Sequence, residues 1–319
     1  IIDWSEKPIG TKILVDLTDI IFFIFTNAKI HIYMKKIGDT ELIINDQNRI
    51  YHLNLKEDEV ANKIILVGDP QRVSQISKKF QKIEHKIEHR EFVTHTGLYN
   101  NKRISAISSG IGTDNIDIVL NELDALVNID FKTKNVKKNK TSLEIIRLGT
   151  SGSLNKDISL DTFLVSQFAI GFDGLAHFYS DHNSLERNLQ DYFVKHTKWD
   201  KKHSYPYAVE SSLNLLNKFD NIDRGITLTA TGFYAPQCRE LRLESSVRNL
   251  QDSINGFSYK GLPITNFEME TSALYFLGKT LGHNVLTICA ILGDRSKDIQ
   301  SKKPIKTIEK LIEIVLKRL

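Results

Sequence analysis

Short apolar runs that end in glycine-containing turns constrain the fold more than any other feature of the sequence. The segments 63–67 (KIILV) and 143–148 (LEIIRL) stop at the turn sequences 68–70 (GDP) and 149–152 (GTSG). Apolar runs of this length that are bounded by turn residues indicate buried strands. The same pattern predicts further strands at 104–108, 162–168, 226–231, 262–267 and 285–292.

Helical periodicity fills several of the intervals between these strands. One helix is expected after 104–108, where Thr113 or Asp114 would cap its N-terminus. Its apolar face is formed by Ile116, Val119, Leu120, Leu123 and Val127. A second helix is expected to end at Gly282, and an amphipathic third one covers 305–319. Strands that alternate with helices favour an α/β fold with a mainly parallel sheet.

Residues 34–319 are expected to form one domain, because no Pro/Gly/Ser-rich linker divides them. Residues 1–33 are interpreted as an N-terminal extension outside this domain, since domain-like sequence begins at the first methionine, Met34. The alternative is an added strand or helix that packs on the domain. The apolar segment 13–25 holds two aspartates and is shorter than the roughly 20 residues of a bilayer span, so no membrane association is expected.

Composition excludes several classes of function. A hydrophobic fraction of 41% supports a substantial core, and a net charge of +4 is too small for a dedicated nucleic-acid binder. The lysine-rich segment 132–141 is interpreted as a solvated loop, because no aromatic residues are interleaved in it. Cys238 and Cys289 cannot form a disulfide framework, which favours a reducing, cytoplasmic compartment. The irregular aromatic segment 176–207 is expected to be an insertion near the site or at a subunit contact.

Anion-binding features follow the predicted strand ends, where ligands bind in parallel α/β sheets. Gly68 lets backbone N–H groups approach an anion, and Arg72 follows one turn later. The segment 109–113 (SGIGT) could cradle a phosphate at a helix N-terminus, although it lacks the lysine of a P-loop. Arg147 ends an apolar strand, where an arginine needs an anion or a buried ion pair. With Arg90, three guanidiniums are available to enclose a phosphate.

The pattern Glu268-Met269-Glu270 lies at a predicted strand-to-helix junction. One carboxylate can fork onto the two hydroxyls of a ribose while the methionine covers the apolar face of the sugar. The alternative is that the two carboxylates stabilise the helix N-terminus electrostatically.

Taken in this order, and over most of the chain after residue 50, these motifs resemble the nucleoside phosphorylase-I family, and within it the members that act on uridine. The segment 231–239 (TGFYAPQCR) is similar to the F-x-x-x-Q-x-R pattern with which those members bind uracil. Gln237 can donate and accept in one plane, Arg239 can donate to a carbonyl oxygen, and Phe233 offers a stacking face.

The resemblance implies a role for each matching residue. The implied phosphate ligands are Gly68, Arg72, Arg147 and Thr150, with Arg90 supplied by a neighbouring subunit. The implied ribose ligands are Glu268, Met269 and Glu270, with His52 supplied by the neighbour. The implied base ligands are Phe233, Gln237 and Arg239, and Arg295 lines the same pocket. The residues expected to act in catalysis are Arg147, Gln237, Arg239, Asp294 and Arg295.

Two departures from the family pattern stand out. Asp294 occupies a position where the uridine members usually have asparagine and the purine members keep a general-acid aspartate. Ala235 and Cys238 occupy positions where glycine is expected, which narrows the loop. The base specificity therefore stays open at this point, between uridine and a purine nucleoside.

The resemblance further implies a three-layer α/β/α sandwich around a mixed, partly barrel-like sheet, assembled as a hexamer built from dimers with shared sites. The implied reaction is reversible phosphorolysis of uridine to uracil and α-D-ribose 1-phosphate in pyrimidine salvage. It needs inorganic phosphate but no redox cofactor, and K⁺ near Glu91 is optional. The alternatives are a purine nucleoside phosphorylase, a nucleosidase, and a nucleoside-binding protein without turnover. The three arginines argue against a nucleosidase, because water needs no anion cage.

Overall fold

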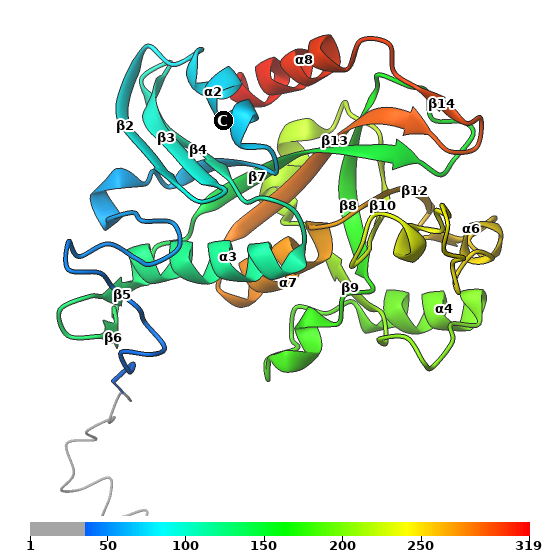
Figure 1. Cartoon of the computed structure of the whole chain (residues 1–319), viewed down its shortest axis with the longest axis horizontal. Coiled ribbons are helices and arrows are strands. Elements are labelled where there is room, and N and C mark those ends of the chain that lie inside the picture. The colour runs from blue at the N-terminus through cyan, green and yellow to red at the C-terminus, as the bar shows by residue number, and fades with distance from the viewer. Residues whose placement is uncertain (1–35) are drawn as a thin grey trace, which may run out of the picture.

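Residues 36–319 are described by the computed structural model, and most of their strands join one sheet (Figure 1). The strands are β1 (Lys63–Val67), β2 (Lys82–His89), β3 (Phe92–Tyr99), β4 (Lys102–Ser108), β5 (Ile129–Asp130), β6 (Asn135–Val136), β7 (Glu144–Ser153), β8 (Phe163–Gly171), β9 (Tyr207–Glu210), β10 (Arg224–Thr229), β11 (Ser258–Tyr259), β12 (Leu262–Glu268), β13 (Asn284–Asp294) and β14 (Ile299–Gln300). Hydrogen bonding arranges the main sheet in the order β11-β12-β10-β8-β13-β7-β1-β4-β3-β2.

Strand β7 lies in the middle of this sheet and carries Arg147 there. It pairs in parallel with β1, where Leu66 lies opposite Arg147, and with β13, where Thr287 lies opposite Arg147. Near its C-terminal end β7 also pairs antiparallel with β12, with Gly152 opposite Phe267. Because β12, β10, β8 and β13 are joined in turn, this contact closes part of the sheet into a partial barrel.

Helices cover both faces of the sheet. The α-helices are α2 (Pro70–Ser77), α3 (Thr113–Asn128), α4 (Arg187–Thr197), α5 (Leu213–Leu216), α6 (Leu250–Ser253), α7 (Thr271–Thr280) and α8 (Pro304–Leu316), and the 3₁₀-helices are η1 (Glu57–Glu59), η2 (Leu175–Phe178), η3 (Asn217–Phe219) and η4 (Ala235–Gln237). Helices α3 and α7 lie side by side on one face, while α2 and α8 lie on the other (Figure 1). The expected three-layer sandwich with a partly barrel-like sheet is confirmed.

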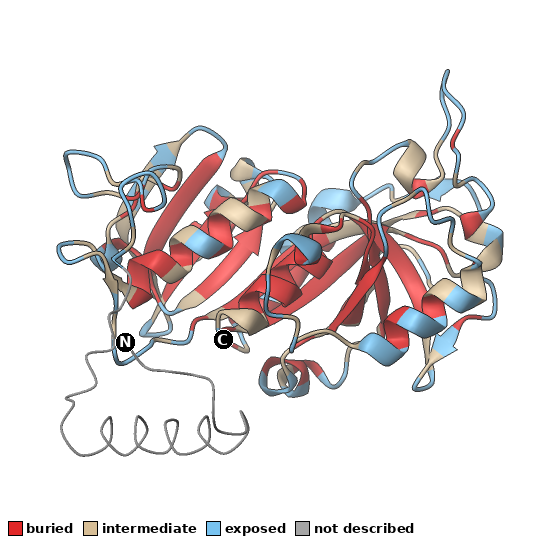
Figure 2. Ribbon diagram, turned by 90° about the horizontal axis from the view of Figure 1, so that it is seen from below, coloured by how far each residue is buried: buried red, intermediate tan, exposed pale blue. Residues whose placement is uncertain are grey.

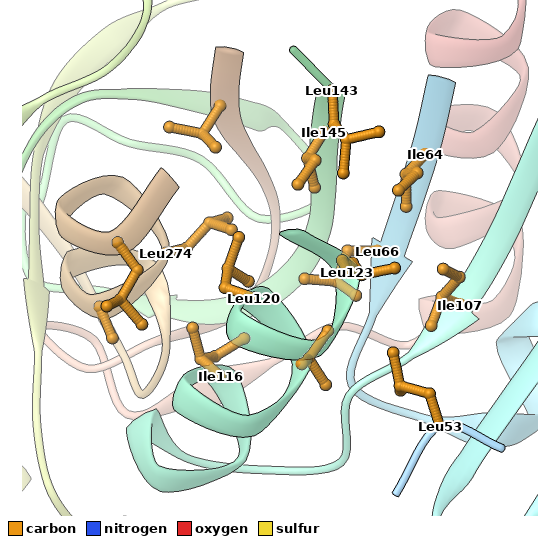
Figure 3. Close-up of a cluster of buried hydrophobic side chains, with 14 of the residues drawn as sticks. Leu53, Ile64, Leu66, Ile107, Ile116, Leu120, Leu123, Leu143, Ile145 and Leu274 are labelled. Atoms are coloured by element: carbon orange, nitrogen blue, oxygen red, sulfur yellow. The ribbon is translucent and has the colours of Figure 1, made fainter. Parts of the chain in front are cut away.

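The core holds the turn before α3 in place. Figure 3 shows Ile116, Leu120 and Leu123 of α3 packed among side chains of β1, β7 and α7. Buried residues fill the strands and the inner faces of the helices, and exposed residues follow the outer faces (Figure 2). Burial of each such leucine or isoleucine side chain stabilises the folded state by about 1.5–3 kcal/mol. The N-terminus of α3 is therefore fixed firmly against the strand ends.

Each expected strand is present, but the end of one strand, one helix cap and one loop segment differ from the prediction. Strand β7 continues through 149–152 instead of ending there, because β12 and β13 supply partners for it. Gly112, with a φ of +99°, precedes α3, so the N-cap prediction at Thr113 or Asp114 is wrong. The segment 176–207, expected to be irregular, contains the regular helix α4, which packs against β9 and α6. The segment does not line the site described below, and its expected subunit contact stays a prediction.

Two further expectations concern segments outside the core. The lysine-rich stretch 132–141 follows β5 and includes β6, which pairs with β5 in a short hairpin. The expected extension, residues 1–33, lies outside the described residues. No helix within 36–319 has the length and apolarity needed to cross a bilayer.

Candidate active site

A cavity of about 910 Å³ opens at the carboxyl ends of β1, β4, β7, β12 and β13. This is the edge at which the sequence predicted ligand binding. The structure brings together there the following sequence-predicted residues: Gly68, Arg72, Thr150, Arg147, Phe233, Gln237, Arg239, Glu268, Met269 and Glu270.

Two arginines form the most basic wall of the cavity. Arg147 is only 4% exposed, and its Nη1 lies 3.0 Å from Glu268 Oε2 while its Nη2 donates to Glu270 Oε2. Burial alone would lower the pKa of the Arg147 guanidinium, but Glu270 and Glu268 outweigh it and raise that pKa. Both sequence interpretations of Arg147, ligand of an anion and buried ion pair, are therefore compatible with its position.

Arg72 lies beside Arg147 and donates from Nη1 to the carbonyl oxygen of Leu148 at 3.1 Å. Burial lowers the pKa of the Arg72 guanidinium, Asp69 raises it, and Arg147 lowers it further. The two guanidiniums therefore repel each other, and a bound anion would relieve this repulsion. A Cβ on Gly68 would lie 3.2 Å from the carbonyl oxygen of Gly110, so glycine lets the two turns approach closely.

The two carboxylates of 268–270 have different environments. Glu268 accepts hydrogen bonds from Thr229 Oγ1 at 2.6 Å, from the Glu270 amide at 3.0 Å and from the Thr271 amide at 3.1 Å. These donors and Arg147 use its lone pairs, so Glu268 anchors Arg147 and the start of α7. The predicted stabilisation of the helix N-terminus is realised in Glu268, and the capacity to bind ribose hydroxyls is left mainly to Glu270.

Glu270 connects three parts of the site. Its Oε1 accepts from the Gly112 amide at 2.8 Å, and its Oε2 accepts from Arg147. Burial raises the pKa of the Glu270 carboxyl, Arg147 lowers it, and Glu268 raises it. Since two carboxylates share one arginine, one negative charge is in excess, which suits a carboxylate that is to accept two sugar hydroxyls.

A second group of cavity residues consists of Gln237, Arg239 and Phe233, and the guanidinium of Arg295 lies beside Arg239. Arg239 Nη1 donates to Gln237 Oε1 at 2.5 Å, and the guanidinium carbon lies 4.0 Å from the centre of the Phe233 ring. Phe233 is 51% exposed, so the ring retains a free face. Burial and the neighbouring Arg295 lower the pKa of the Arg239 guanidinium.

Arg295 reaches the same region from the end of β13. Its Nη2 donates to the carbonyl oxygen of Cys238 at 3.3 Å, and its Nη1 is buried without a hydrogen-bond partner among residues 36–319. A Cβ on Gly152 would lie 3.4 Å from Arg295 Cγ and 3.7 Å from Arg239 Nη2. Arg295 itself was expected to line the base pocket, but it is not among the residues that line the cavity and lies beside the lining residues Gly152 and Arg239.

Asp294, which the sequence predicted to act in catalysis, lies at the end of β13 outside the cavity lining. This residue is 2% exposed. Its carboxylate accepts from Ser296 Oγ at 2.6 Å and from Lys297 Nζ at 2.9 Å. Burial would raise the pKa of the Asp294 carboxyl, but these hydrogen bonds and that of the Ser296 amide lower it. The Asp294 carboxylate is therefore held within the turn, and its role in catalysis stays a prediction.

His52 and Arg90 lie beyond the cavity of their own chain. His52 Nδ1 lies 2.6 Å from Glu122 Oε1, and the exposed Arg90 lies 5.3 Å from the centre of the Tyr51 ring. A role in the site of a neighbouring copy requires such a surface position. That role stays a prediction.

The K⁺ expected near Glu91 also stays a prediction. Glu91 and Asn115 both line the cavity, and a Cβ on Gly110 would lie 3.1 Å from Glu91 Cγ and 2.4 Å from Asn115 Nδ2. Among the described residues, no group of three or more His, Cys, Asp or Glu side chains is arranged to hold a metal ion.

Sequence reasoning missed several residues that line the cavity. Leu292 and Gly293 come directly before Asp294, and Gln300 lies opposite Gly293 in the β13–β14 pairing. Gly293 carried the same signal as Gly68, a glycine after an apolar strand. Gln300 carried no local signal, because only the hairpin brings it to the site.

A basic anion wall, a carboxylate for vicinal hydroxyls and a polar edge beside a ring define a site for cleaving nucleosides with phosphate. Residues 62–319 match the Phosphorylase superfamily, and the chain belongs to it. The resemblance to nucleoside phosphorylases is thereby confirmed.

Relatives of this chain carry the names of two kinds of enzyme, uridine phosphorylases and purine nucleoside phosphorylases. The chain is 27% identical to the uridine phosphorylase of Thermococcus kodakarensis over 271 residues, which cover 82% of this chain and 83% of that protein. It is 28% identical to a DeoD-type purine nucleoside phosphorylase of Clostridium novyi, over 83% of this chain and 97% of that protein. Among solved structures, a Trypanosoma brucei nucleoside phosphorylase described as showing uridine phosphorylase activity superposes with a TM-score of 0.77 and 27% identity. That superposition covers 87% of this chain and 99% of the other.

Proposed function

We propose that this protein catalyses the reversible phosphorolysis of uridine to uracil and α-D-ribose 1-phosphate. The observation that carries the proposal is the contact of Arg239 with Gln237 beside the half-exposed ring of Phe233. An amide and a guanidinium in one region match the carbonyl, N–H and carbonyl edge of uracil. A site built to pair such an edge discriminates strongly against bases that lack it.

The phosphate binds between Arg72 and Arg147, and the ribose lies against Met269 with its hydroxyls on Glu270. As the C1′–N1 bond breaks, positive charge develops on the ribose and the electron pair passes to N1 of uracil. A phosphate oxygen then forms the new bond to C1′ from the opposite face, so no covalent enzyme intermediate is needed. Gln237, Arg239 and Arg295 stabilise the negative charge on the departing uracil.

A purine nucleoside phosphorylase is the second candidate, because DeoD-type relatives match this chain about as well as uridine phosphorylases do. Asp294 was the residue that favoured it, and its position outside the cavity lining supports the uridine proposal instead. A nucleosidase would not need the paired Arg72 and Arg147.

The proposal includes an assembly and a setting. We place the protein in pyrimidine salvage in the cytoplasm, with the free thiols of Cys238 and Cys289 in support. Inorganic phosphate is the co-substrate, no redox cofactor takes part, and K⁺ near Glu91 is optional. The active form is a hexamer built from dimers, in which His52 and Arg90 complete the neighbouring site.

The proposal is tested by incubating the protein with uridine or inosine, each with and without phosphate, and measuring free base by liquid chromatography. We expect uracil only when uridine and phosphate are both present. Release without phosphate would indicate a nucleosidase, release from inosine alone a purine enzyme, and no release a binding protein.

Shared sites predict activity in mixed oligomers. When His52→Ala and Glu270→Gln chains are assembled together, some sites combine an intact Glu270 with an intact His52 from the neighbour, so activity should return. His52→Ala mixed with Arg90→Ala is the matched control and should stay inactive, because every site then lacks one donated residue. Recovery in the control mixture, or none in the first, would contradict donation across one boundary.

A further inference from the structure

The turn between β13 and β14 is built around the carboxylate of Asp294. Its Oδ1 accepts from the Ser296 amide at 3.0 Å, from Ser296 Oγ at 2.6 Å and from the Lys297 amide at 3.2 Å. Its Oδ2 accepts from Lys297 Nζ at 2.9 Å. Lys297 Nζ also donates to the carbonyl oxygen of Lys156 at 2.9 Å, which ties the turn to the loop after β7.

One arm of this hairpin carries Arg295, which lies beside Arg239, and the other carries Gln300, which lines the cavity. Arg295 follows Asp294 directly, its amide donates to the carbonyl oxygen of Ser153 at 3.1 Å, and its guanidinium lies 5.8 Å from the centre of the Phe267 ring. Gln300 lies opposite Gly293 across the hairpin, and both line the cavity. A change in the turn would therefore displace Arg295 and Gln300 together.

We propose that Asp294 and Lys297 form a positioning pair that sets the hairpin, and with it Arg295 and Gln300, against the base of the substrate. The inference rests on the proposed function and adds to it a determinant of base binding. Neither residue of the pair lines the cavity, whereas Gln300 lines it and Arg295 lies over the ring of the lining residue Phe267. The pair therefore acts through Arg295 and Gln300.

Both oxygens of Asp294 accept hydrogen bonds, so an amide in its place can satisfy the donors on one side only. In Asp294→Asn, Oδ1 keeps its three donors, but an amide N–H₂ then faces the Lys297 ammonium, and two donors cannot bond each other. In Lys297→Gln, the glutamine amide can still donate to Asp294 Oδ2. In the double variant, the glutamine oxygen can accept from the asparagine amide, which restores the contact in neutral form.

The test measures kcat and KM for uridine at saturating phosphate in the two single variants and the double variant. Neighbouring residues commonly couple strongly enough for an effect of about tenfold. We expect Asp294→Asn to raise KM about tenfold with kcat within about threefold, and both Lys297→Gln and the double variant to lie within about threefold of the parent. Lys202→Gln is the matched control, because Lys202 makes a 3.0 Å ion pair with Asp200 on an exposed loop away from the cavity.

Three results would overturn the proposal: an unchanged KM in Asp294→Asn, no recovery in the double variant, or a loss of kcat of about a hundredfold that Lys297→Gln does not restore. The last would mean that Asp294 acts on the reacting atoms. Hydrogen exchange of the 295–300 amides gives a second measurement that needs no activity. Exchange should accelerate in Asp294→Asn and return in the double variant, and unchanged exchange would refute the pair. If the parent protein releases no uracil, the proposed function fails while this measurement still tests the pair.

Discussion

Glu268 and Glu270 should contribute differently to stability and to activity. Glu268→Gln is expected mainly to lower stability, and Glu270→Gln mainly to lower activity. In Glu268→Gln, one side-chain oxygen remains for Thr229 Oγ1 and the Thr271 amide. The other oxygen accepts from the Glu270 amide and lies 3.0 Å from Arg147 Nη1, and it becomes a donor in the variant. The Glu270 amide and Arg147 Nη1 then lose their acceptor. Each buried donor without an acceptor costs about 1–3 kcal/mol, so the free energy of unfolding should fall by about 3 kcal/mol.

Glu270→Gln should behave in the opposite way. The two carboxylates share Arg147, and burial with the nearby Glu268 raises the pKa of the Glu270 carboxyl. A carboxyl whose pKa is raised in the folded state makes folding less favourable as pH rises above its unfolded value, so at neutral pH the amide removes this unfavourable contribution. That gain offsets the cost of the amide N–H₂, which faces either the Gly112 amide or Arg147, so the net change in stability should be small. Phosphorolysis should nevertheless fall by about a hundredfold or more, because the ribose loses its charged acceptor.

The assay is differential scanning calorimetry combined with uracil release on the same preparations. A loss of about 3 kcal/mol corresponds to a Tm lower by about 5 °C in a domain of this size, because the entropy of unfolding is about 2.1 cal/mol/K per residue. We expect this for Glu268→Gln and a shift of less than about 2 °C for Glu270→Gln. A stable Glu268→Gln together with a strongly destabilised Glu270→Gln would refute the division of roles between the two carboxylates.

Three further predictions concern the base-binding region and its thiols. In the uracil-release assay, Arg239→Ala should lower kcat/KM for uridine by about a hundredfold, mostly through kcat. Arg248→Ala is the control and should leave kcat/KM unchanged, because Arg248 is exposed and lies outside the cavity. Cys238 has a φ of +58°, so Cys238→Gly should relieve about 1 kcal/mol of backbone strain, but it also removes the hydrogen bond from Sγ to the carbonyl oxygen of Val247. The Tm measured by calorimetry should rise by no more than about 2 °C, and a clearly lower Tm would contradict this. Burial raises the pKa of the Cys289 thiol to about 12, so the thiol stays protonated at pH 8 and the native protein should resist iodoacetamide there; mass spectrometry showing rapid labelling of Cys289 would disprove it.

Local patterns predicted the parts of the fold that depend on neighbours in sequence. The apolar runs of β1 and β7 and the spacing of α3 needed only a short window. Arg147 could be singled out because a charged residue at the end of a buried strand needs a partner, and Arg72 because it follows the glycine turn at Gly68. The hairpin of β2 and β3 was missed, because the polar alternation of 82–89 (KIEHKIEH) indicates no buried face.

Long-range contacts decided what the sequence could not show. Strand β7 continues past Gly149 only because β12 and β13 pair with it there. Glu268 uses its lone pairs partly on Thr229, which belongs to β10, and no pattern around Glu268 reveals that donor. The direction of Asp294 depends on Lys297 three residues later, a contact that a motif match to a family position does not contain.

The central place of β7 has a consequence for synthesis of the chain. Glu144 at its start pairs with Asn284, which is translated 140 residues later. At about 10 residues per second, the ribosome needs on the order of 14 s to deliver that partner. During this time one edge of an apolar strand on the nascent chain has no partner, and unpaired edges of this kind promote aggregation. Chains truncated before Asn284 should therefore accumulate as aggregates rather than as partly active protein, and completion of the site should coincide with release of the last segment.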